Sequence, residues 1–224
     1  MKKYQKEFIE FAIKRKALCF GEYKLKSGRI SPYFFNTGLF NDGESLTKLG
    51  RFYAEALQNS EIKFDMIYGP AYKGIPLAST IAVSFHEIFG KNYPFCFNRK
   101  EIKDHGEGGF TFGAEIQNRV IIIDDVISAG TSINESINII QPKGGAVVGA
   151  IVAVNRQERG EGKKSAIQEA EEKFNIKIIS IINLNDIITY IGEHDAYKKH
   201  LKSLNHYIQQ YGEINNDLKM IVIL

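Results

Sequence analysis

Short apolar runs alternate with amphipathic stretches along most of this chain. Five runs of β-branched or aromatic residues have the length and composition of strands, and they cover residues 65–68, 94–98, 120–123, 146–154 and 176–182. Stretches with the apolar spacing of helices separate these runs, at residues 45–58, from the end of the loop 69–76 to Phe89, and at 133–140 and 165–174. Strands that alternate with helices predict an α/β fold, with a mainly parallel central sheet flanked by helices.

Both ends of the chain depart from this alternation. Apolar spacing over residues 8–18 predicts a first helix that ends before Gly21. Residues 20–37 have the β-branched, aromatic and Gly/Ser/Pro content of a short hairpin, with residues 27–29 at its turn. Residues 196–211 predict the clearest helix of the C-terminal part. We expect the hairpin and the tail to lie outside the central sheet.

Length and composition narrow the class of protein. A chain of 224 residues with a formal net charge of +3 fits one soluble domain, and the charge is too weak to indicate nucleic acid as a partner. Cys19 and Cys96 are far apart, have no metal-ligand spacing and follow no secretory leader, so they indicate free thiols in a reducing compartment. No apolar stretch approaches the length of a membrane span. We expect a cytoplasmic protein that binds neither nucleic acid nor membranes.

Residues 120–132, V-I-I-I-D-D-V-I-S-A-G-T-S, combine a buried strand with groups that bind a ligand. Asp124 and Asp125 end the β-branched run, at the edge of the sheet where open α/β folds bind their ligands. The Gly, Thr and Ser residues that follow open a helix, whose N-terminus favours an anion such as phosphate. The stretch suggests carboxylates for hydroxyls or a metal beside a phosphate cradle, although strands that end in Asp are common and the stretch alone does not decide. No P-loop or dinucleotide-binding motif offers another explanation.

Other candidate residues follow neighbouring elements. Lys73 precedes the helix that runs to Phe89, and Arg156 follows the run 146–154, so both are expected at the same edge of the sheet. Lys26 in the hairpin is by itself typical of a solvated lysine. Residues 99–109 have almost no apolar content and end in glycines, which predicts either a solvated loop or a mobile lid.

Four motifs in this order carry a family resemblance: L-K-S-G-R-x-S-P-Y-F-F, G-P-A-Y-K-G-I-P, R-K-E-x-K-D-H-G-E-G-G and I-D-D-V-I-S-A-G-T-S. Together they resemble the orotate phosphoribosyltransferases of pyrimidine synthesis, which are type I phosphoribosyltransferases. The match runs from Leu25 to Arg156, and after about residue 160 only the general pattern agrees. The resemblance implies one domain over residues 1–224, with a small N-terminal hood mainly from residues 1–40 and a core at about 60–185.

The resemblance also implies the reaction and its residues. The 5-phosphoribosyl group of phosphoribosyl diphosphate (PRPP) passes to orotate, giving orotidine 5'-monophosphate and diphosphate. The implied catalytic residues are Lys103, His105, Asp124 and Asp125. The implied substrate-binding residues are these four with Lys26, Phe34, Phe35, Tyr72, Lys73, Arg99, Lys100, Val126, Ile127, Ser128, Ala129, Gly130, Thr131, Ser132 and Arg156. Position 128 is usually threonine in the family, and serine keeps its hydroxyl.

A metal and a partner follow from the same resemblance. Mg²⁺ is the expected cofactor, and because substrate oxygens supply most of its ligands, no dedicated cage of protein ligands is expected. The subunit is expected to form a homodimer with shared active sites, in which the basic loop 99–109 reaches the neighbour's site.

Two other readings remain open. A phosphoribosyltransferase for a purine base would keep the motif at residues 124–132 but gives no reason for the hairpin around Lys26 or for the loop 99–109 as written. A regulator that senses PRPP without catalysis would usually carry a nucleic-acid-binding segment or lack lid residues, whereas Lys103 and His105 are both present here.

Overall fold

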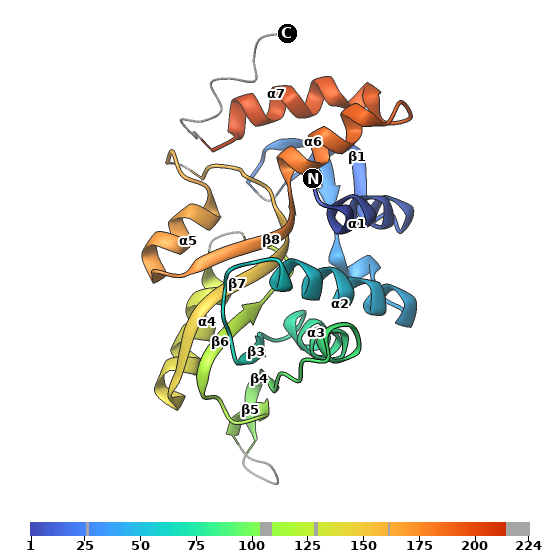
Figure 1. The fold of residues 1–224 in the computed structure, drawn as a ribbon. Helices are drawn as coiled ribbons and strands as arrows, with labels where there is room; N and C mark the ends of the chain where they lie inside the picture. Colours follow the sequence, from blue (N-terminus) through green and yellow to red (C-terminus); the bar gives the residue numbers. More distant parts are fainter. Residues whose placement is uncertain (26, 104–108, 128–129, 161, 214–224) are drawn as a thin grey trace.

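A computed structural model describes residues 1–25, 27–103, 109–127, 130–160 and 162–213. Its main element is a six-stranded sheet with the order β5-β4-β3-β6-β7-β8 (Figure 1). The strands are β3 (Met66–Gly69), β4 (Phe95–Lys103), β5 (Gly109–Gly113), β6 (Asn118–Ile123), β7 (Gly145–Asn155) and β8 (Lys177–Asn183). Neighbours are parallel except β4 and β5, which are antiparallel. The predicted α/β fold with a mainly parallel sheet is confirmed.

Strand β6 lies at the centre of two hydrophobic cores. Its last four residues are fully buried, and successive side chains of a strand point to opposite faces of the sheet. Ile121 and Ile123 join the core on one face, while Val120 and Ile122 join the core on the other. The next residue is Asp124, so the strand delivers a carboxylate to the edge of the sheet directly after its most buried part.

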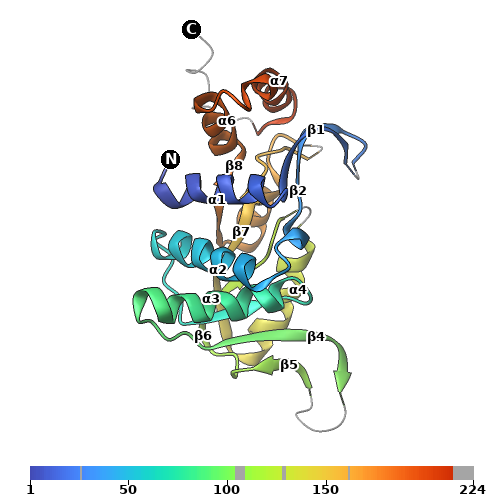
Figure 2. The same cartoon turned by 90° about the vertical axis from the view of Figure 1, so that its right-hand side faces the viewer.

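Helices cover both faces of the sheet. Helices α2 (Gly43–Gln58) and α3 (Gly74–Phe89) contribute to the core that contains Ile121, and Figure 2 shows them side by side. Helices α4 (Thr131–Ile140) and α5 (Ala166–Phe174) contribute to the core that contains Val120. Because each face has its own helices, the apolar part of β6, residues 120–123, is shielded from water on both sides.

A second, smaller unit stands beside one end of the main sheet (Figure 1). It consists of the antiparallel strands β1 (Leu18–Lys24) and β2 (Ile30–Phe35) with the helices α1 (Lys3–Lys14), α6 (Leu184–Glu193) and α7 (Leu201–Tyr211). We call these five elements the hood. The hairpin thus lies outside the central sheet, as expected. Short 3-10 helices, η1 (Thr37–Leu39), η2 (Gln141–Lys143) and η3 (Lys198–His200), complete the chain.

The first helix is shorter than expected. It ends at Lys14, Lys16 has a left-handed backbone (φ 58°), and Leu18 already pairs with Phe35 in the hairpin. Residues 15–18 were therefore wrongly predicted as helix, because apolar side chains are buried equally well from a strand.

The polar stretch 99–109 is not a plain loop. Strand β4 continues to Lys103, and β5 begins at Gly109 and returns beside β4, with Asn98 opposite Thr111. We call residues 99–103 and 109–113 the arm (Figure 2). Backbone hydrogen bonds hold the arm, so it forms despite its low apolar content, and the alternative of a plain solvated loop was wrong there. The alternative of a mobile lid stays a prediction. Residues 104–108 lie outside the described part of the chain.

Helix α6 was not predicted, although its start is visible in the sequence. The side chains of Asn183 and Asp186 form a reciprocal capping box, each accepting a hydrogen bond from the other's backbone N–H. Helix α7 begins at Leu201, later than the predicted residue 196. Within the described residues, no helix combines the length and the apolar content needed to cross a membrane.

The turn between β3 and α3 generates a stability prediction. A Cβ added to Gly69 would lie 2.1 Å from the carbonyl oxygen of Gly74. Gly69→Ala is expected to lower the free energy of unfolding by about 2–4 kcal/mol, because the obstacle is backbone that cannot rotate away. Gly192→Ala in α6, where nothing lies within 4 Å of the added Cβ, is the control and should change it by less than about 1 kcal/mol. Equal urea midpoints for the two variants would contradict the prediction.

Candidate active site

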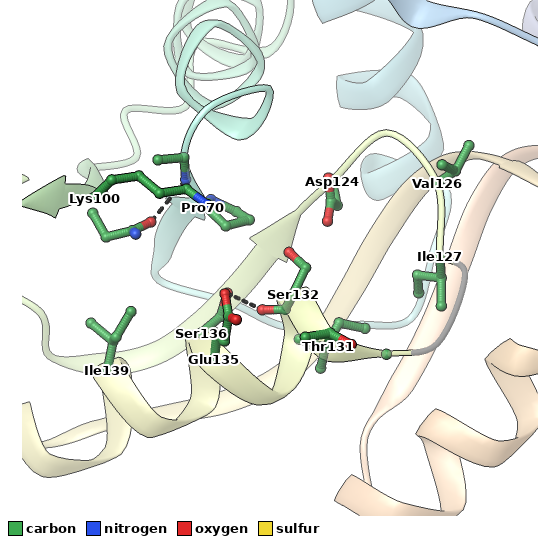
Figure 3. A pocket seen from close by; sticks show the side chains of 14 residues that line it. Pro70, Lys100, Asp124, Val126, Ile127, Thr131, Ser132, Glu135, Ser136 and Ile139 are labelled. Carbon is green, nitrogen blue, oxygen red and sulfur yellow. Dashed lines mark hydrogen bonds between the residues drawn. The ribbon is translucent and has the colours of Figure 1, made fainter. Parts of the chain in front are cut away.

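A cavity of about 290 Å³ opens where the carboxyl ends of β3 and β6 meet the start of α4 (Figure 3). Asp124 follows β6, and Gly130, Thr131 and Ser132 lead into α4. Pro70 from the loop after β3 lies on the opposite side of the cavity in Figure 3. The position is the one expected for a ligand site in an open parallel sheet.

Asp125 is buried and held by two side chains. Only 6% of Asp125 is exposed. Its Oδ2 accepts a hydrogen bond of 2.6 Å from the Thr37 hydroxyl and lies 2.5 Å from the Lys73 Nζ. The Lys73 side chain itself is 63% exposed. A buried carboxylate is stable when it is paired and hydrogen-bonded, and here both conditions are met from separate elements.

Asp124 lies next to it in a less compensated environment. Its Oδ1 accepts a hydrogen bond from the Asp125 backbone N–H at 2.8 Å, and its carbonyl oxygen accepts one from the buried Tyr53 hydroxyl at 2.8 Å. Burial raises the pKa of Asp124 to about 6, although hydrogen bonding from Ser132 and from the Asp125 backbone acts in the opposite direction. Figure 3 shows the side chains of Asp124 and Ser132 facing each other across the cavity.

Helix α4 begins without a capping side chain. Gly130 stands at its N-cap with a left-handed backbone (φ 68°) and offers no side chain to the first N–H groups. By contrast, the side chains of Asp42, Ser165 and Asn183 cap α2, α5 and α6. The first N–H groups of a helix need an acceptor, and the helix dipole favours a negative one. The start of α4 is therefore suited to an anionic group of a ligand in the cavity.

The loop after β3 is fixed to β4. The Ala71 backbone N–H donates to Oδ1 of Asn98 at 2.8 Å, and the peptide bond between Ala71 and Tyr72 is cis. Tyr72 is 69% exposed, and the Lys100 ammonium lies 5.7 Å from the centre of its ring. Lys100 also lines the cavity, so β4 adds a cation to the wall opposite α4.

Arg156 follows β7 at the same edge of the sheet and reaches the hood. Its guanidinium lies 4.4 Å from the centre of the Tyr33 ring and 2.6 Å from Oε1 of Glu158. It also donates to the Ser31 hydroxyl at 3.1 Å. The guanidinium is thus fixed on its face by an aromatic ring and along its edge by oxygen acceptors.

The two phenylalanines of β2 have different environments. Phe34 is 41% exposed, and its ring stacks on Tyr23 at 5.4 Å. Phe35 packs against the hydrophobic core beside Phe8. One ring of the pair is therefore available to a ligand and the other anchors the hairpin.

Arg99 points along the arm. Its guanidinium donates to the Gly109 carbonyl oxygen at 3.1 Å and lies 5.4 Å from the centre of the Phe112 ring. The neighbouring Asn98 and Lys100 line the cavity, which agrees with the alternation of side chains along a strand. Lys103 ends β4 at the far end of the arm, by its backbone position.

The structure brings together many, but not all, of the residues that the sequence indicated. Those that line the cavity are Lys100, Asp124, Val126, Ile127, Gly130, Thr131 and Ser132. Lys73 lies close to these residues, because it pairs with Asp125, the neighbour of Asp124. Phe34, Phe35 and Arg156 lie at the hood. The expected site residues Lys26, His105, Ser128 and Ala129 lie outside the described part of the chain.

Sequence reasoning missed two groups of residues. Glu135, Ser136 and Ile139 line the cavity from α4, and Ser136 is one helical turn after the recognised Ser132. That spacing of four was a readable signal. Thr37 and Tyr53, which hold the aspartates from distant elements, gave no signal in the local sequence.

Metal ligands are few. Among the residues that the structure describes, no group of three or more His, Cys, Asp or Glu side chains is placed to hold a metal ion. The carboxylate oxygens of Asp124 and Asp125 are nevertheless the type of donor that Mg²⁺ prefers.

Comparison with known proteins gives consistent matches. The model of the phosphoribosyl transferase domain matches residues 37–182. Orotate phosphoribosyltransferases of Yersinia enterocolitica and Escherichia coli are 54% and 55% identical over 212 residues, which is 95% of this chain and 100% of each relative. The crystal structure of orotate phosphoribosyltransferase from Francisella tularensis has a TM-score of 0.84 at 39% identity, covering 92% of this chain and 100% of that one.

More distant structures share the fold. Orotate phosphoribosyltransferase of Mycobacterium tuberculosis in complex with PRPP has a TM-score of 0.59 at 22% identity, covering 82% of this chain and 98% of that one. Because the family model spans more than half of the chain and relatives of 54–55% identity cover almost all of it, this chain belongs to the orotate phosphoribosyltransferases, within the type I phosphoribosyltransferase family.

Proposed function

We propose that the protein transfers the 5-phosphoribosyl group from PRPP to orotate, giving orotidine 5'-monophosphate and diphosphate in pyrimidine synthesis. The observation that carries the proposal is the pair Asp124 and Asp125 at the end of β6, beside the uncapped start of α4. This arrangement supplies carboxylates for ribose hydroxyls and N–H donors for the 5-phosphate. The relatives at 54–55% identity carry the same enzyme name.

The chemistry requires separate stabilisation of two charges. A ring nitrogen of orotate attacks the anomeric carbon while the bond from that carbon to diphosphate breaks, and the electron pair leaves with diphosphate. Positive charge grows on the ribose and negative charge on the leaving group. Lys73 and Lys100 are placed to attract the diphosphate, and the half-buried Asp124 and the buried Asp125 lie where the ribose would bind.

Lys73 has a second function while no substrate is bound. Its ammonium neutralises Asp125 at 2.5 Å, and its exposed side chain is free to turn toward an arriving diphosphate. Asp125 then keeps the Thr37 hydrogen bond and becomes available to ribose hydroxyls. Arrival of PRPP therefore moves the Lys73 ammonium from Asp125 to the diphosphate, and hydrogen bonds from Thr37 and from ribose hydroxyls then compensate the buried Asp125 charge.

We assign the metal as Mg²⁺ held mainly by substrate oxygens, with Asp124 or Asp125 as the protein carboxylates nearest to it. When bound, it neutralises part of the charge of the diphosphate. The oxygen donors present suit this hard cation, and one or two carboxylates are sufficient for a substrate-bound Mg²⁺.

Arg156 and Phe34 form the expected base-binding side. A guanidinium matches the planar geometry of a carboxylate with two parallel hydrogen bonds, and orotate carries a carboxylate. The exposed ring of Phe34 is available for contact with the pyrimidine. The family resemblance implies that Ser128 completes this side and that Lys26 acts near the diphosphate.

We further propose that the active protein is a homodimer with shared sites. Arg99 lies on the face of the arm away from the cavity, packed on Phe112, so this cation is turned from the site of its own subunit. The arm with Arg99 and Lys103 would then serve the neighbour's diphosphate, as the family resemblance implies. The cytoplasmic location remains a prediction.

The reaction is tested with a panel of bases. Diphosphate release from PRPP in the presence of Mg²⁺ is expected to be rapid with orotate and slower by a factor of at least about 10³ with uracil, adenine, guanine or hypoxanthine, because a site built for a carboxylate leaves its cation unpaired with other bases. The measurement is the initial rate of diphosphate release with each base at saturating PRPP. Turnover of a purine equal to that of orotate would reject the assignment.

The raised pKa of Asp124 predicts how stability depends on pH. The folded protein, with a pKa of about 6, binds this proton more tightly than the unfolded chain, with about 3.9. The group's contribution is therefore most favourable at acid pH and is lost as the pH rises through about 6. Asp124→Asn should exceed wild type in unfolding free energy at pH 8, on the order of 1 kcal/mol, and the gap should shrink toward pH 4.5.

Urea denaturation of both proteins without substrate at the two pH values gives this measurement. A gap of the same size at pH 8 and pH 4.5 would mean that burial of the Asp124 charge is not its origin.

The shared site is tested by mixing two inactive variants. Lys73→Ala damages the pocket and Lys103→Ala damages the arm, so a mixed dimer with arms acting in trans has one site with both lesions and one intact site. After random exchange at equal amounts, about a quarter of all sites should recover activity. If subunit exchange is verified by mass spectrometry and activity stays at the level of the parents, the arm acts within its own subunit.

A further inference from the structure

A row of side chains in contact through their rings and guanidinium groups connects the base-binding side with the C-terminal helix. The Arg156 guanidinium lies 4.4 Å from the centre of the Tyr33 ring, and Tyr33 meets Tyr207 of α7 edge to face at 6.5 Å. Tyr207 contacts Tyr211 at 5.0 Å, and the Arg29 guanidinium lies 4.8 Å from the Tyr211 ring. We call these five residues the aromatic row. It starts after β7, crosses β2 and α7, and ends at the turn of the hairpin.

The middle of the row is buried. Tyr33 is fully buried and Tyr207 is 3% exposed, and among the described residues neither hydroxyl has a hydrogen-bond partner. The Tyr207 ring supplies the contact with Tyr33. Its hydroxyl is nevertheless near the charged pair of the site: burial and Glu158 raise the pKa of Tyr207, while Arg156 lowers it.

The end of α7 is also fastened to the segment that follows Arg156. The Arg159 backbone N–H donates to the Tyr211 carbonyl oxygen at 2.9 Å, and the Glu213 N–H donates to the Gln157 carbonyl oxygen at 2.8 Å. Arg29 from the hairpin turn donates to the Arg159 carbonyl oxygen at 2.8 Å. The end of α7, the segment that follows Arg156 and the turn of the hairpin thus meet, although they are distant in sequence. The segment after Arg156 and the hairpin both adjoin residues assigned to the base.

From this arrangement we propose that α7 positions Arg156 for the orotate carboxylate, with Tyr207 as the positioning residue. The proposal rests on the function proposed above, in which Arg156 binds that carboxylate. Two parallel hydrogen bonds to a carboxylate require the guanidinium plane to be fixed. Glu158 and Ser31 fix its edge, and Tyr33 fixes its face. The Tyr33 ring in turn is held in its plane by the perpendicular ring of Tyr207.

Loss of the Tyr207 ring should therefore affect the base and leave PRPP largely unaffected. In Tyr207→Leu, KM for orotate is expected to rise at least about fivefold, with KM for PRPP within about twofold of wild type, since the ribose and phosphate groups bind at the ends of β3 and β6. Tyr207→Phe keeps the ring and should restore an orotate KM within about twofold of wild type, because the ring makes the edge-to-face contact with Tyr33.

Leu204→Ala is the matched control. Leu204 lies on the same helix, is fully buried and is not part of the row. This variant should lower the melting temperature and leave the ratio of the two KM values unchanged. If Tyr207→Leu does not fold, Tyr211→Leu removes the next ring from a half-buried position, and it should raise KM for orotate by about two- to threefold.

A double variant separates this proposal from the one on which it depends. Arg156→Ala should raise KM for orotate strongly, and Tyr207→Leu added to it should have no further effect on that KM, because the positioned group is already gone. If Arg156→Ala leaves KM for orotate unchanged, the assigned role of Arg156 fails. If Arg156→Ala raises it but the ring variants do not, or if Leu204→Ala raises it equally, only the positioning role of Tyr207 is overturned.

Discussion

Burying two adjacent carboxylates at the end of a strand costs free energy, and the organisation of the site follows from how unequally that cost is met. Asp125 receives a lysine and a hydroxyl, so its charge is compensated within the protein. Asp124 receives hydrogen bonds from Ser132 and from the Asp125 backbone N–H, yet burial still raises its pKa to about 6. The unliganded site thus stores an electrostatic cost at Asp124. A substrate that brings hydroxyl donors or a bound cation relieves this cost. Part of the binding energy is therefore specific to a ribose that offers hydroxyls or a cation to Asp124.

The same reasoning applies to the helices that start near the site. Helices α2, α5 and α6 begin with a capping side chain, whereas α3 begins at Lys73 without one and α4 begins at a glycine in a left-handed conformation. A capping side chain would satisfy the first N–H groups and stabilise the free protein, but it would compete with a phosphate for those donors. The pocket is therefore assembled from groups left incomplete in the free protein, a common compromise between stability and function.

The sequence was informative where one element by itself determines the outcome. The apolar run ending in Asp124 predicted both a strand covered on two faces and a ligand at its end, and the structure has the strand and the cavity in those places. It was uninformative where the outcome depends on pairing between distant segments. The arm exists because β5 pairs with β4, and Asp125 is held by Thr37 from a segment 88 residues away. No local pattern encodes such partners.

The extent of the family model separates the groups proposed for PRPP from most of those proposed for the base. Its match over residues 37–182 contains Lys73, the two aspartates and the start of α4, which are the groups proposed to bind the phosphates and the ribose. The base side instead combines Arg156 with groups outside that range, on β2 and α7.

This division has a physical reason. The groups proposed for PRPP belong to the sheet that the family model covers, whereas each base needs its own donors and rings. An added hood can change these without disturbing the buried strands. Placing the support for Arg156 on a helix that packs outside the central sheet lets the recognition of the base vary at little cost to the core that positions the aspartates.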